Sequence, residues 1–230
     1  MYPIVAIEDS RKIFDKLNNY YGVKFGINPE FSQIRIEEVL VNGQGVYNFD
    51  VKKERPGVTE QSLRRNDLFV AINMGFYFMM ENAAKPGVSY LLPYAQQGEE
   101  AGETSVYKPG FATDDIQALY NGKLYCQTGT IVNIEDMPMS VFQKVPEYQA
   151  GATTVIDMMK SQITMAEKLA FAGTQDHVVK VSFPSFTTSN YASATTGEVA
   201  KLVFIAYGYK VPGGTGDKFR TDENPFRALI

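Results

Sequence analysis

The longest apolar stretch of the chain, residues 67–82, constrains the fold most. It reads DLFVAINMGFYFMMEN, and one set of alternate positions, from Leu68 to Met80, is apolar throughout. The intervening positions are mixed and include Asn73 and Gly75. Because successive side chains of a strand point to opposite faces, this alternation predicts a strand with one fully apolar face. A membrane-spanning helix needs about 20 apolar residues, so we interpret the stretch as the central strand of a β-rich domain.

Alternating patterns predict further strands along most of the chain. Each pattern is a short run of alternating apolar and polar residues, bounded by Gly, Pro or Asn. They cover residues 31–41, 46–52, 88–94, 123–128, 130–135, 162–185 and 198–211. Asn42-Gly43 tolerates the positive φ values of a tight turn, which predicts a hairpin between the first two of these segments. The turn cluster at residues 173–176 likewise predicts a hairpin within 162–185. Gly129, between 123–128 and 130–135, predicts a bend or bulge.

Two helices and a C-terminal tail complete the predicted elements. Residues 8–21 place apolar side chains at spacings of three and four, with charged ones largely opposite, which predicts an amphipathic helix. This helix packs on its own domain, or it lies against a membrane or a neighbouring subunit. Residues 113–122 begin with Thr and two Asp residues and predict a short helix. Residues 212–230 show no periodicity and are either flexible or an arm that orders against something else.

Composition excludes several classes of function. The chain has 230 residues, 44% of them apolar, and can therefore fill a sizeable core. Its net charge of −4 and scattered Lys and Arg residues give no basic footprint for nucleic acid. With one histidine and no tryptophan, the composition favours a structural or binding role over an enzyme. The N-terminus lacks a basic region followed by a long apolar run, so we expect no signal peptide and a chain made in a cytoplasm.

Three features that often mark functional sites have simpler interpretations here. His177 lies beside a predicted turn, but no GxSxG-type nucleophile accompanies it. Cys126, the one cysteine, can form no internal disulfide and is expected in the core. Gly213–Lys218 follows a strand as a phosphate loop would, but it lacks the Lys-Ser/Thr ending, which favours a flexible linker.

The acidic residues also predict no site. Asp114, Asp115, Glu135 and Asp136 lack the alternating pattern of a calcium loop, so solvated caps and turns are favoured. The acids at 99–103 lie in a predicted exposed loop, a poor place for the paired carboxylates of a glycosidase. We therefore predict no catalytic residue, no cofactor-binding residue and no metal ligand.

Residues 45–79 carry a resemblance to a known family. The matching features are Asn48-Phe49-Asp50, the run LRRNDLFV at 63–70 and the long strand after it. Weaker similarity occurs at 183–186 and 203–208. On these residues the chain resembles the major capsid proteins of tailless icosahedral phages that carry an internal membrane and infect Bacteroidetes.

The resemblance implies an all-β, jelly-roll protein. Subunits of that family have two upright jelly rolls, form trimers and tile a shell over a membrane. We therefore expect two compact barrels (a double jelly roll), with a single elaborated jelly roll as the alternative; a bend at Gly75 would favour two barrels. The expected divisions are an N-terminal helix and arm at 1–30, a first barrel or half-barrel at 31–110, a second at 111–211 and a C-terminal arm at 212–230.

The implied function is that of a structural virion protein. We expect a major capsid protein that self-assembles, as homotrimers, into an icosahedral bacteriophage shell in the host cytoplasm. The N-terminal helix and C-terminal arm are the expected contacts to neighbouring capsomers, minor capsid proteins or an internal viral membrane, and no sequence-specific nucleic acid binding is expected. The alternatives are a minor capsid, decoration or spike protein, or a carbohydrate-binding β-barrel module. A cupin-type metal enzyme would need more than one histidine.

Overall fold

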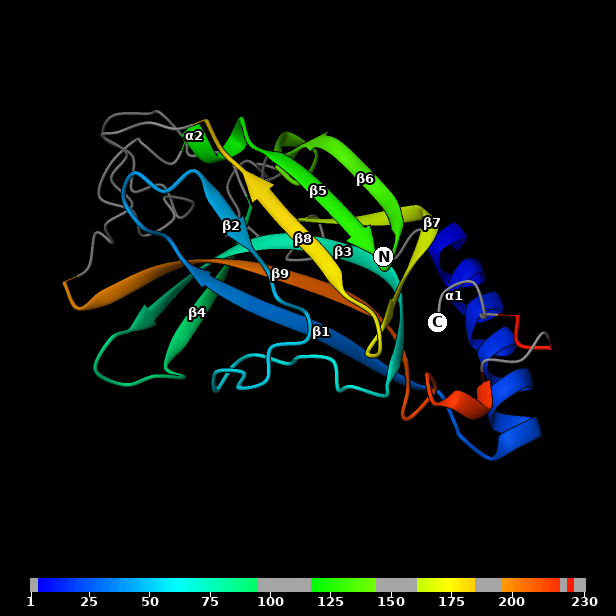
Figure 1. Ribbon diagram of the computed structural model, residues 1–230. Coiled ribbons are helices and arrows are strands. Elements are labelled where there is room, and N and C mark those ends of the chain that lie inside the picture. The colour runs from blue at the N-terminus through cyan, green and yellow to red at the C-terminus, as the bar shows by residue number, and fades with distance from the viewer. Residues whose placement is uncertain (1–3, 95–116, 144–160, 185–195, 220–222, 226–230) are drawn as a thin grey trace, which may run out of the picture.

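The structure is a computed structural model that describes residues 4–94, 117–143, 161–184, 196–219 and 223–225 (Figure 1). In these residues, nine strands form two antiparallel sheets that face each other, and a helix lies at one end. The strands are β1 (Glu30–Val39), β2 (Val46–Asn48), β3 (Leu68–Asn82), β4 (Ser89–Pro93), β5 (Lys123–Thr128), β6 (Ile131–Pro138), β7 (Gln162–Ala172), β8 (His177–Ser182) and β9 (Glu198–Val211). The helical segments are α1 (Ile4–Leu17), the π-helical η1 (Asn18–Val23), α2 (Gln117–Tyr120) and the 3₁₀ turns η3 (Met139–Val141) and η5 (Asp217–Phe219). The predicted β-rich chain with a short N-terminal helix is confirmed.

The larger sheet contains five strands. Its order is β1-β9-β3-β4, and β7 also pairs with β3. All ten residues of β1 pair with β9 without a register shift. β3 pairs with β9 along its whole length, with one irregularity between Ala71 and Asn73. The two longest strands, β3 and β9, are thus the centre of this sheet.

The smaller sheet contains four strands in the order β2-β8-β5-β6. Within it, β5 and β6 are joined directly by a turn at Gly129, whose φ is 57°. The predicted bend at this glycine is therefore confirmed, because a positive φ favours glycine.

Without β4, the strands pair in a nested order. The first pairs with the last (β1 with β9), the second with the last but one (β2 with β8), and the third with the sixth (β3 with β7). The two strands in the middle, β5 and β6, pair with each other. Pairings of β9 with β3 and of β8 with β5 complete the two sheets. Each sheet therefore combines strands from residues 31–110 and from residues 111–211.

β3 confirms the strand predicted at residues 67–82 and continues through Gly75 as one element. The strand changes its neighbour at this point, since its first half pairs with β7 as far as Gly75 and its second half pairs with β4. A Cβ atom at Gly75 would lie 2.5 Å from the carbonyl oxygen of Ser161, the residue before β7. The glycine therefore allows the close approach of β7 and does not end the strand.

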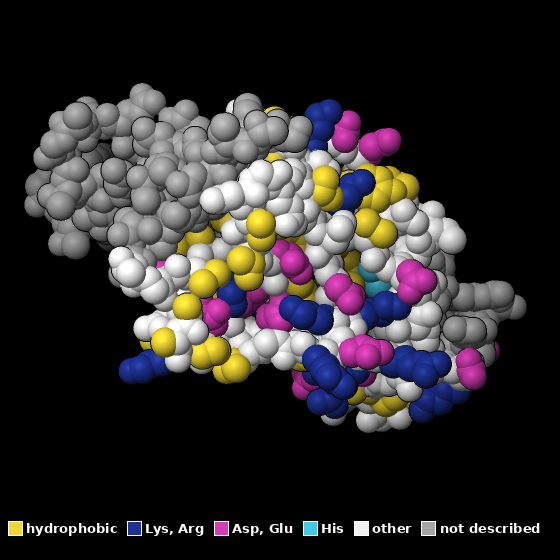
Figure 2. Space-filling model, turned by 60° about the vertical axis from the view of Figure 1, so that its left-hand side comes forward, with side chains coloured by type: hydrophobic (Ala, Val, Ile, Leu, Met, Phe, Trp, Pro, Cys, Tyr) yellow, Lys and Arg dark blue, Asp and Glu magenta, His cyan; other side chains and the backbone are white. Residues whose placement is uncertain are grey.

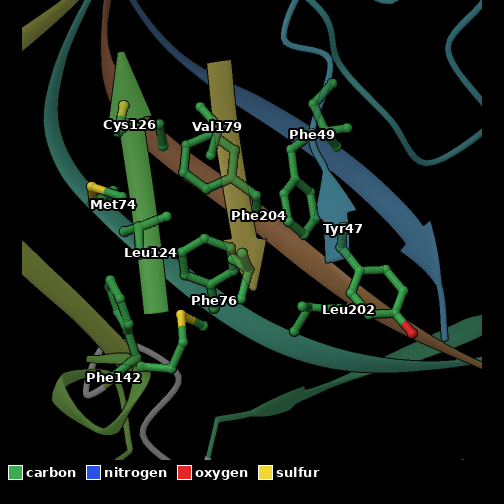
Figure 3. Close-up of a cluster of buried hydrophobic side chains, with 14 of the residues drawn as sticks. Tyr47, Phe49, Met74, Phe76, Leu124, Cys126, Phe142, Val179, Leu202 and Phe204 are labelled. Carbon is green, nitrogen blue, oxygen red and sulfur yellow. The ribbon is translucent and has the colours of Figure 1, made fainter. Parts of the chain in front are cut away.

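The main core lies between the two sheets. Phe76 of β3 is at its centre, with ring centroids 5.0 Å from Phe142, 5.4 Å from Phe204 and 5.5 Å from Phe49. Figure 3 shows side chains of the smaller sheet, among them Leu124, pointing toward these rings from the opposite side. Aromatic side chains of this size supply most of the apolar area that such a core buries.

The hairpins predicted at Asn42-Gly43 and at residues 173–176 are both wrong. A turn does follow Asn42, with Gly43 at a φ of 76°, but β1 pairs with β9 and β2 with β8. The turn at 173–176 also exists, yet β7 pairs with β3 while β8 lies in the other sheet. In both places the chain crosses from one sheet to the other, because each strand finds a long-range partner in place of its sequence neighbour.

The other predicted elements differ mainly at their ends. The N-terminal helix begins at Ile4, earlier than predicted, and continues as η1 to Val23, beyond the predicted end at residue 21. The predicted helix at 113–122 is described only from Gln117, where α2 begins, and residues 113–116 lie outside the described part. The strand predicted at 198–211 matches β9 at both ends.

Candidate functional site

The N-terminal helix packs on the outer face of the larger sheet. Ile13 and Leu17 of α1 and Tyr20 and Tyr21 of η1 are buried there together with Phe219. They form a second hydrophobic cluster with outward-facing residues of the sheet, namely Leu68, Val70, Ile72, Ala170, Ala172 and Val211. The prediction that this helix packs on its own domain is therefore confirmed for the side that carries Ile13 and Leu17.

The opposite side of α1 is exposed and charged. It carries Arg11, Lys12, Asp15 and Lys16. Among the helices that the structure describes, none has the length and apolar content needed to cross a membrane.

The first part of the C-terminal tail is held against α1, η1 and β3. The N–H of Gly213 donates to Asp67 Oδ1 at 3.0 Å, and the N–H of Thr215 donates to the carbonyl oxygen of Asn66 at 3.0 Å. The hydroxyl of Tyr21 donates to the carbonyl oxygen of Gly214 at 3.1 Å. The flexible-linker interpretation of residues 213–218 is therefore wrong, and their backbone amides are used within the fold instead of being presented to a phosphate.

Aromatic rings and an amide side chain hold the described end of this arm. The Phe219 ring lies 5.0 Å from Tyr21 and 5.0 Å from Phe25. Asn224 Nδ2 donates to the carbonyl oxygen of Phe219 at 2.8 Å and to the hydroxyl of Tyr21 at 3.3 Å. Burial raises the pKa of Tyr21 to about 12. Residues 213–219 and 223–225 thus follow the helix layer, as Figure 1 shows at the right.

Four charged side chains form a network on the outer face of the larger sheet: Arg35 and Glu37 of β1, Lys201 of β9 and Glu81 of β3. Arg35 donates from Nε and Nη2 to Glu37 Oε1, at 3.0 Å and 2.9 Å. Lys201 Nζ contacts Glu37 Oε2 at 3.1 Å and also pairs with Glu81. Burial alone would lower the pKa of Lys201, but its hydrogen bonds to Glu81 and Glu37 raise it.

Residues 53–61, which we call the strap, close this network from the outside. Thr59 Oγ1 donates to Glu37 Oε1 at 2.7 Å, and Glu60 Oε1 accepts from the N–H of Glu37 at 2.9 Å. Gln61 and Arg35 exchange two backbone hydrogen bonds, each of 2.8 Å. Because β1 is an edge strand, these bonds occupy backbone groups that could otherwise pair with another chain.

This network is not among the features predicted from the sequence. The sequence does contain a sign of it, namely charged residues at outward positions of the strands, such as Lys201 next to the apolar residues 202–206 of β9. A charge in such a place needs a partner when it is covered. Nothing in the local sequence shows that the partner lies on β1 and β3.

His177 and Cys126 are placed as core-associated residues. His177 Nε2 lies 2.8 Å from the carbonyl oxygen of Ala172, and its ring packs 5.3 Å from that of Phe171. Burial lowers the pKa of His177. Cys126 is fully buried in the main core, and burial raises the pKa of its thiol to about 12. A thiol in such surroundings is unreactive.

Of the acidic residues considered above, the structure describes Glu135 and Asp136. Asp136 is exposed and pairs with Lys123 at 3.0 Å, and Glu135 is exposed beside it. Asp114, Asp115 and the acids at 99–103 lie outside the described residues. Within the part of the chain that is described, no group of three His, Cys, Asp or Glu residues is placed to hold a metal ion.

One end of the sandwich is apolar at its surface. This apolar end consists of Val39, Val41, Val46, Val58, Val88 and Tyr90, all exposed. They come from the end of β1 and the turn after it, from β2, from the strap and from β4 with the residue before it. Figure 2, in which the side that carries β4 comes forward, shows hydrophobic side chains gathered there. An exposed apolar patch of this kind marks an interaction site more often than isolated apolar residues do.

Comparison with protein-family models and with curated proteins finds no match for this chain.

Proposed function

We propose that the chain is a single eight-stranded jelly roll, with β4 as an added strand, and that it is a coat protein of a bacteriophage shell. A jelly roll is a ribbon of eight strands rolled into two four-stranded sheets, so its first and last strands pair and its middle strands pair. The nested order of pairing described above supports this arrangement and is the observation that carries the proposal. Of the two arrangements expected from the sequence, it favours the single barrel.

The family resemblance supports the choice of function. Jelly rolls occur in viral capsids and also in lectins, so the fold alone does not decide between these classes. The segment that resembles internal-membrane phage coat proteins, residues 45–79, covers β2, the strap and most of β3. We therefore propose a major capsid protein of the virion, assembled as trimers, and keep a minor capsid, decoration or spike protein as the alternative.

The surfaces support a role based on contacts between copies. The apolar end offers an exposed hydrophobic patch, and a shell reuses each contact many times, so modest contact energy per copy suffices. We propose the charged side of α1 as the contact to minor capsid proteins or an internal membrane.

A carbohydrate-binding module is less well supported. Such modules stack sugars on open aromatic rings, and the ring of Tyr125 is the candidate on the outer face of the smaller sheet. Lys180 Nζ lies over that ring, 5.1 Å from its centroid. The ring therefore already has a cation on one side.

Light scattering after size exclusion, followed by negative-stain electron microscopy, tests the proposal. A coat protein is expected to give trimers or larger species, and closed or sheet-like particles as its concentration rises. A protein that remains monomeric at every concentration would overturn the proposal. Saturable binding on a glycan array by such a monomer would establish the carbohydrate-binding alternative.

A further inference from the structure

We infer that the apolar end receives residues 226–230 of a second copy of this chain, an inference that rests on the proposed self-association. The segment reads FRALI, four apolar residues and one arginine. It lies outside the described residues and directly follows Pro225, where the described part of the arm ends. In this arrangement the apolar end is the receptor and the segment is its ligand.

The receptor is assembled from segments far apart in the sequence. Six of the twelve large hydrophobic residues that are exposed in the described part belong to it, and Val58 is the most exposed of all at 82%. The other five are between 44% and 59% exposed. A Cβ atom at Gly87 would lie 3.1 Å from Val58 Cγ1, so the strap touches the turn before β4. The strap and this turn are therefore in contact at the apolar end.

The segment starts from the opposite end of the sandwich. The arm that leads to it is held at the beginning of β3, where Gly213 bonds to Asp67, and at η1, where Asn224 bonds to Tyr21. The apolar end lies where β3 finishes, since Val88 bonds to Asn82 through its carbonyl oxygen. Figure 1 shows these two regions at the right and left of the molecule.

Residues 226–230 are too short to reach the apolar end of their own chain. β3 has 15 residues, and at about 3.3 Å per residue its ends are roughly 45 Å apart along the strand. Five residues span at most about 18 Å when fully extended. Even on a curved sheet, residues 226–230 stop well short of the apolar end of the same chain. The receptor must therefore belong to a neighbouring copy, which makes the contact a head-to-tail one that closed shells and rings can use.

The chemistry of the two surfaces is complementary. Phe226, Leu229 and Ile230 supply apolar side chains for a surface made of valines and one tyrosine. At the rim, Tyr90 donates through its hydroxyl to Glu198 Oε2 at 3.3 Å, so a carboxylate borders the patch. That carboxylate offers Arg227 an oppositely charged neighbour.

Cysteine cross-linking between two full-length variants tests the inference. Cys126 is buried, so a new surface cysteine is the reactive thiol of the described surface. Val88→Cys protein is mixed with Leu229→Cys protein, oligomers are isolated, and disulfide-linked dimers are measured by mass. We expect the V88C–L229C product to exceed a control product of V178C with L229C by about tenfold, because Val178 is exposed on the smaller sheet, away from the apolar end.

The outcomes separate this inference from the proposed function. Oligomers that form without the V88C–L229C product, or with equal product from V178C, would overturn the inference and leave the coat-protein proposal standing. An absence of oligomers would overturn both. As a second measurement, the double variant V58D/V88D should raise the protein concentration needed for oligomers by about tenfold or more, while I131D, also at an exposed position, should not. Circular dichroism establishes that each variant is folded.

Discussion

The backbone N–H of Glu37 donates a hydrogen bond to Glu60 Oε1 at 2.9 Å and so joins the edge of the larger sheet to a residue 23 positions later. The same oxygen accepts from Lys53 Nζ at 2.8 Å. One carboxylate thus holds the strap closed over the network, and its removal leaves a covered backbone donor without a partner.

Replacing Glu60 by alanine should release the strap. We expect a loss of about 1–3 kcal/mol in the free energy of unfolding, since a covered N–H and a lysine lose their partner. Hydrogen exchange at residues 57–61 should become faster. Glu54→Ala is the control, because Glu54 is an exposed residue of the same segment. Unchanged exchange in Glu60→Ala would show that the backbone bonds between Gln61 and Arg35 suffice.

Acid should weaken the attachment of the strap and the network. The hydrogen bond from Lys201 is the main cause that lowers the pKa of Glu81. For Glu60, burial alone would raise the pKa, but hydrogen bonds from Lys53, Gly57 and Glu37 together lower it. Carboxylates with lowered pKa values stabilise the folded state above their ordinary pKa of 4.5, and this stabilisation is lost as pH falls below that value. Urea unfolding at a series of pH values should therefore show a steeper acid loss for the wild type than for Glu81→Gln. If stability fell with pH equally in the wild type and in Glu81→Gln, the pair of Glu81 with Lys201 would not be a source of the acid sensitivity.

Gly75→Ala should destabilise the fold, because its Cβ would meet the Ser161 carbonyl oxygen at 2.5 Å. A backbone atom cannot move aside as a flexible side chain can, so we expect about 1–3 kcal/mol in thermal or urea unfolding. Gly216→Ala is the matched control, since its Cβ would be 3.5 Å from the nearest atom, an ordinary contact. Equal stability of the two variants would mean that β7 can shift without cost.

Phe76→Ala should remove the centre of the main core. This side chain is fully buried among three aromatic rings, and truncation of such a phenylalanine costs about 3–5 kcal/mol. Phe31→Ala should have a small effect, because Phe31 is 66% exposed. Chemical unfolding of both variants measures the difference, and a difference below about 1 kcal/mol would contradict the placement of the core.

Tyr21→Phe should loosen the C-terminal arm and leave the sheets intact. The substitution removes the hydroxyl that donates to Gly214 and accepts from Asn224, at an expected cost of about 1 kcal/mol. Limited proteolysis should cut residues 213–225 faster than in the wild type. Tyr125→Phe serves as the control, because its hydroxyl bonds Gln127 on the other sheet. Equal cleavage rates would show that the ring of Tyr21, without its hydroxyl, holds the arm.

The strands themselves were readable from the sequence. Residues 67–82 and 198–211 each carry a long alternation that only a strand accommodates, and β3 and β9 match them within one residue. Gly129 also identified its turn, because adjacent strands there pair with each other. A local sequence pattern is therefore enough to predict a single strand, or a turn between two strands that are adjacent in sequence and pair with each other.

Pairing across the sandwich could not be read in the same way. Asn42-Gly43 specifies a reversal of the chain, but whether the next strand joins the same sheet depends on residues near 180 that pair with β2. The place of Phe219 depends in turn on Tyr21, almost 200 residues earlier. The network around Glu37 has the same character, since its members are ordinary surface charges until β1, β3 and β9 lie side by side.

The nested pairing has a consequence for synthesis on the ribosome. Glu30 pairs with Lys210, 180 residues later, so the first strand waits for almost the whole chain before its neighbour exists. β3 likewise lacks both β7 and β9 until the last third of translation. Folds dominated by such distant pairs fold slowly, and exposed strand edges promote aggregation in the meantime. The strap is made directly after β1 and β2, and by occupying the edge of β1 it can protect that strand from other nascent chains while β9 is still being synthesised.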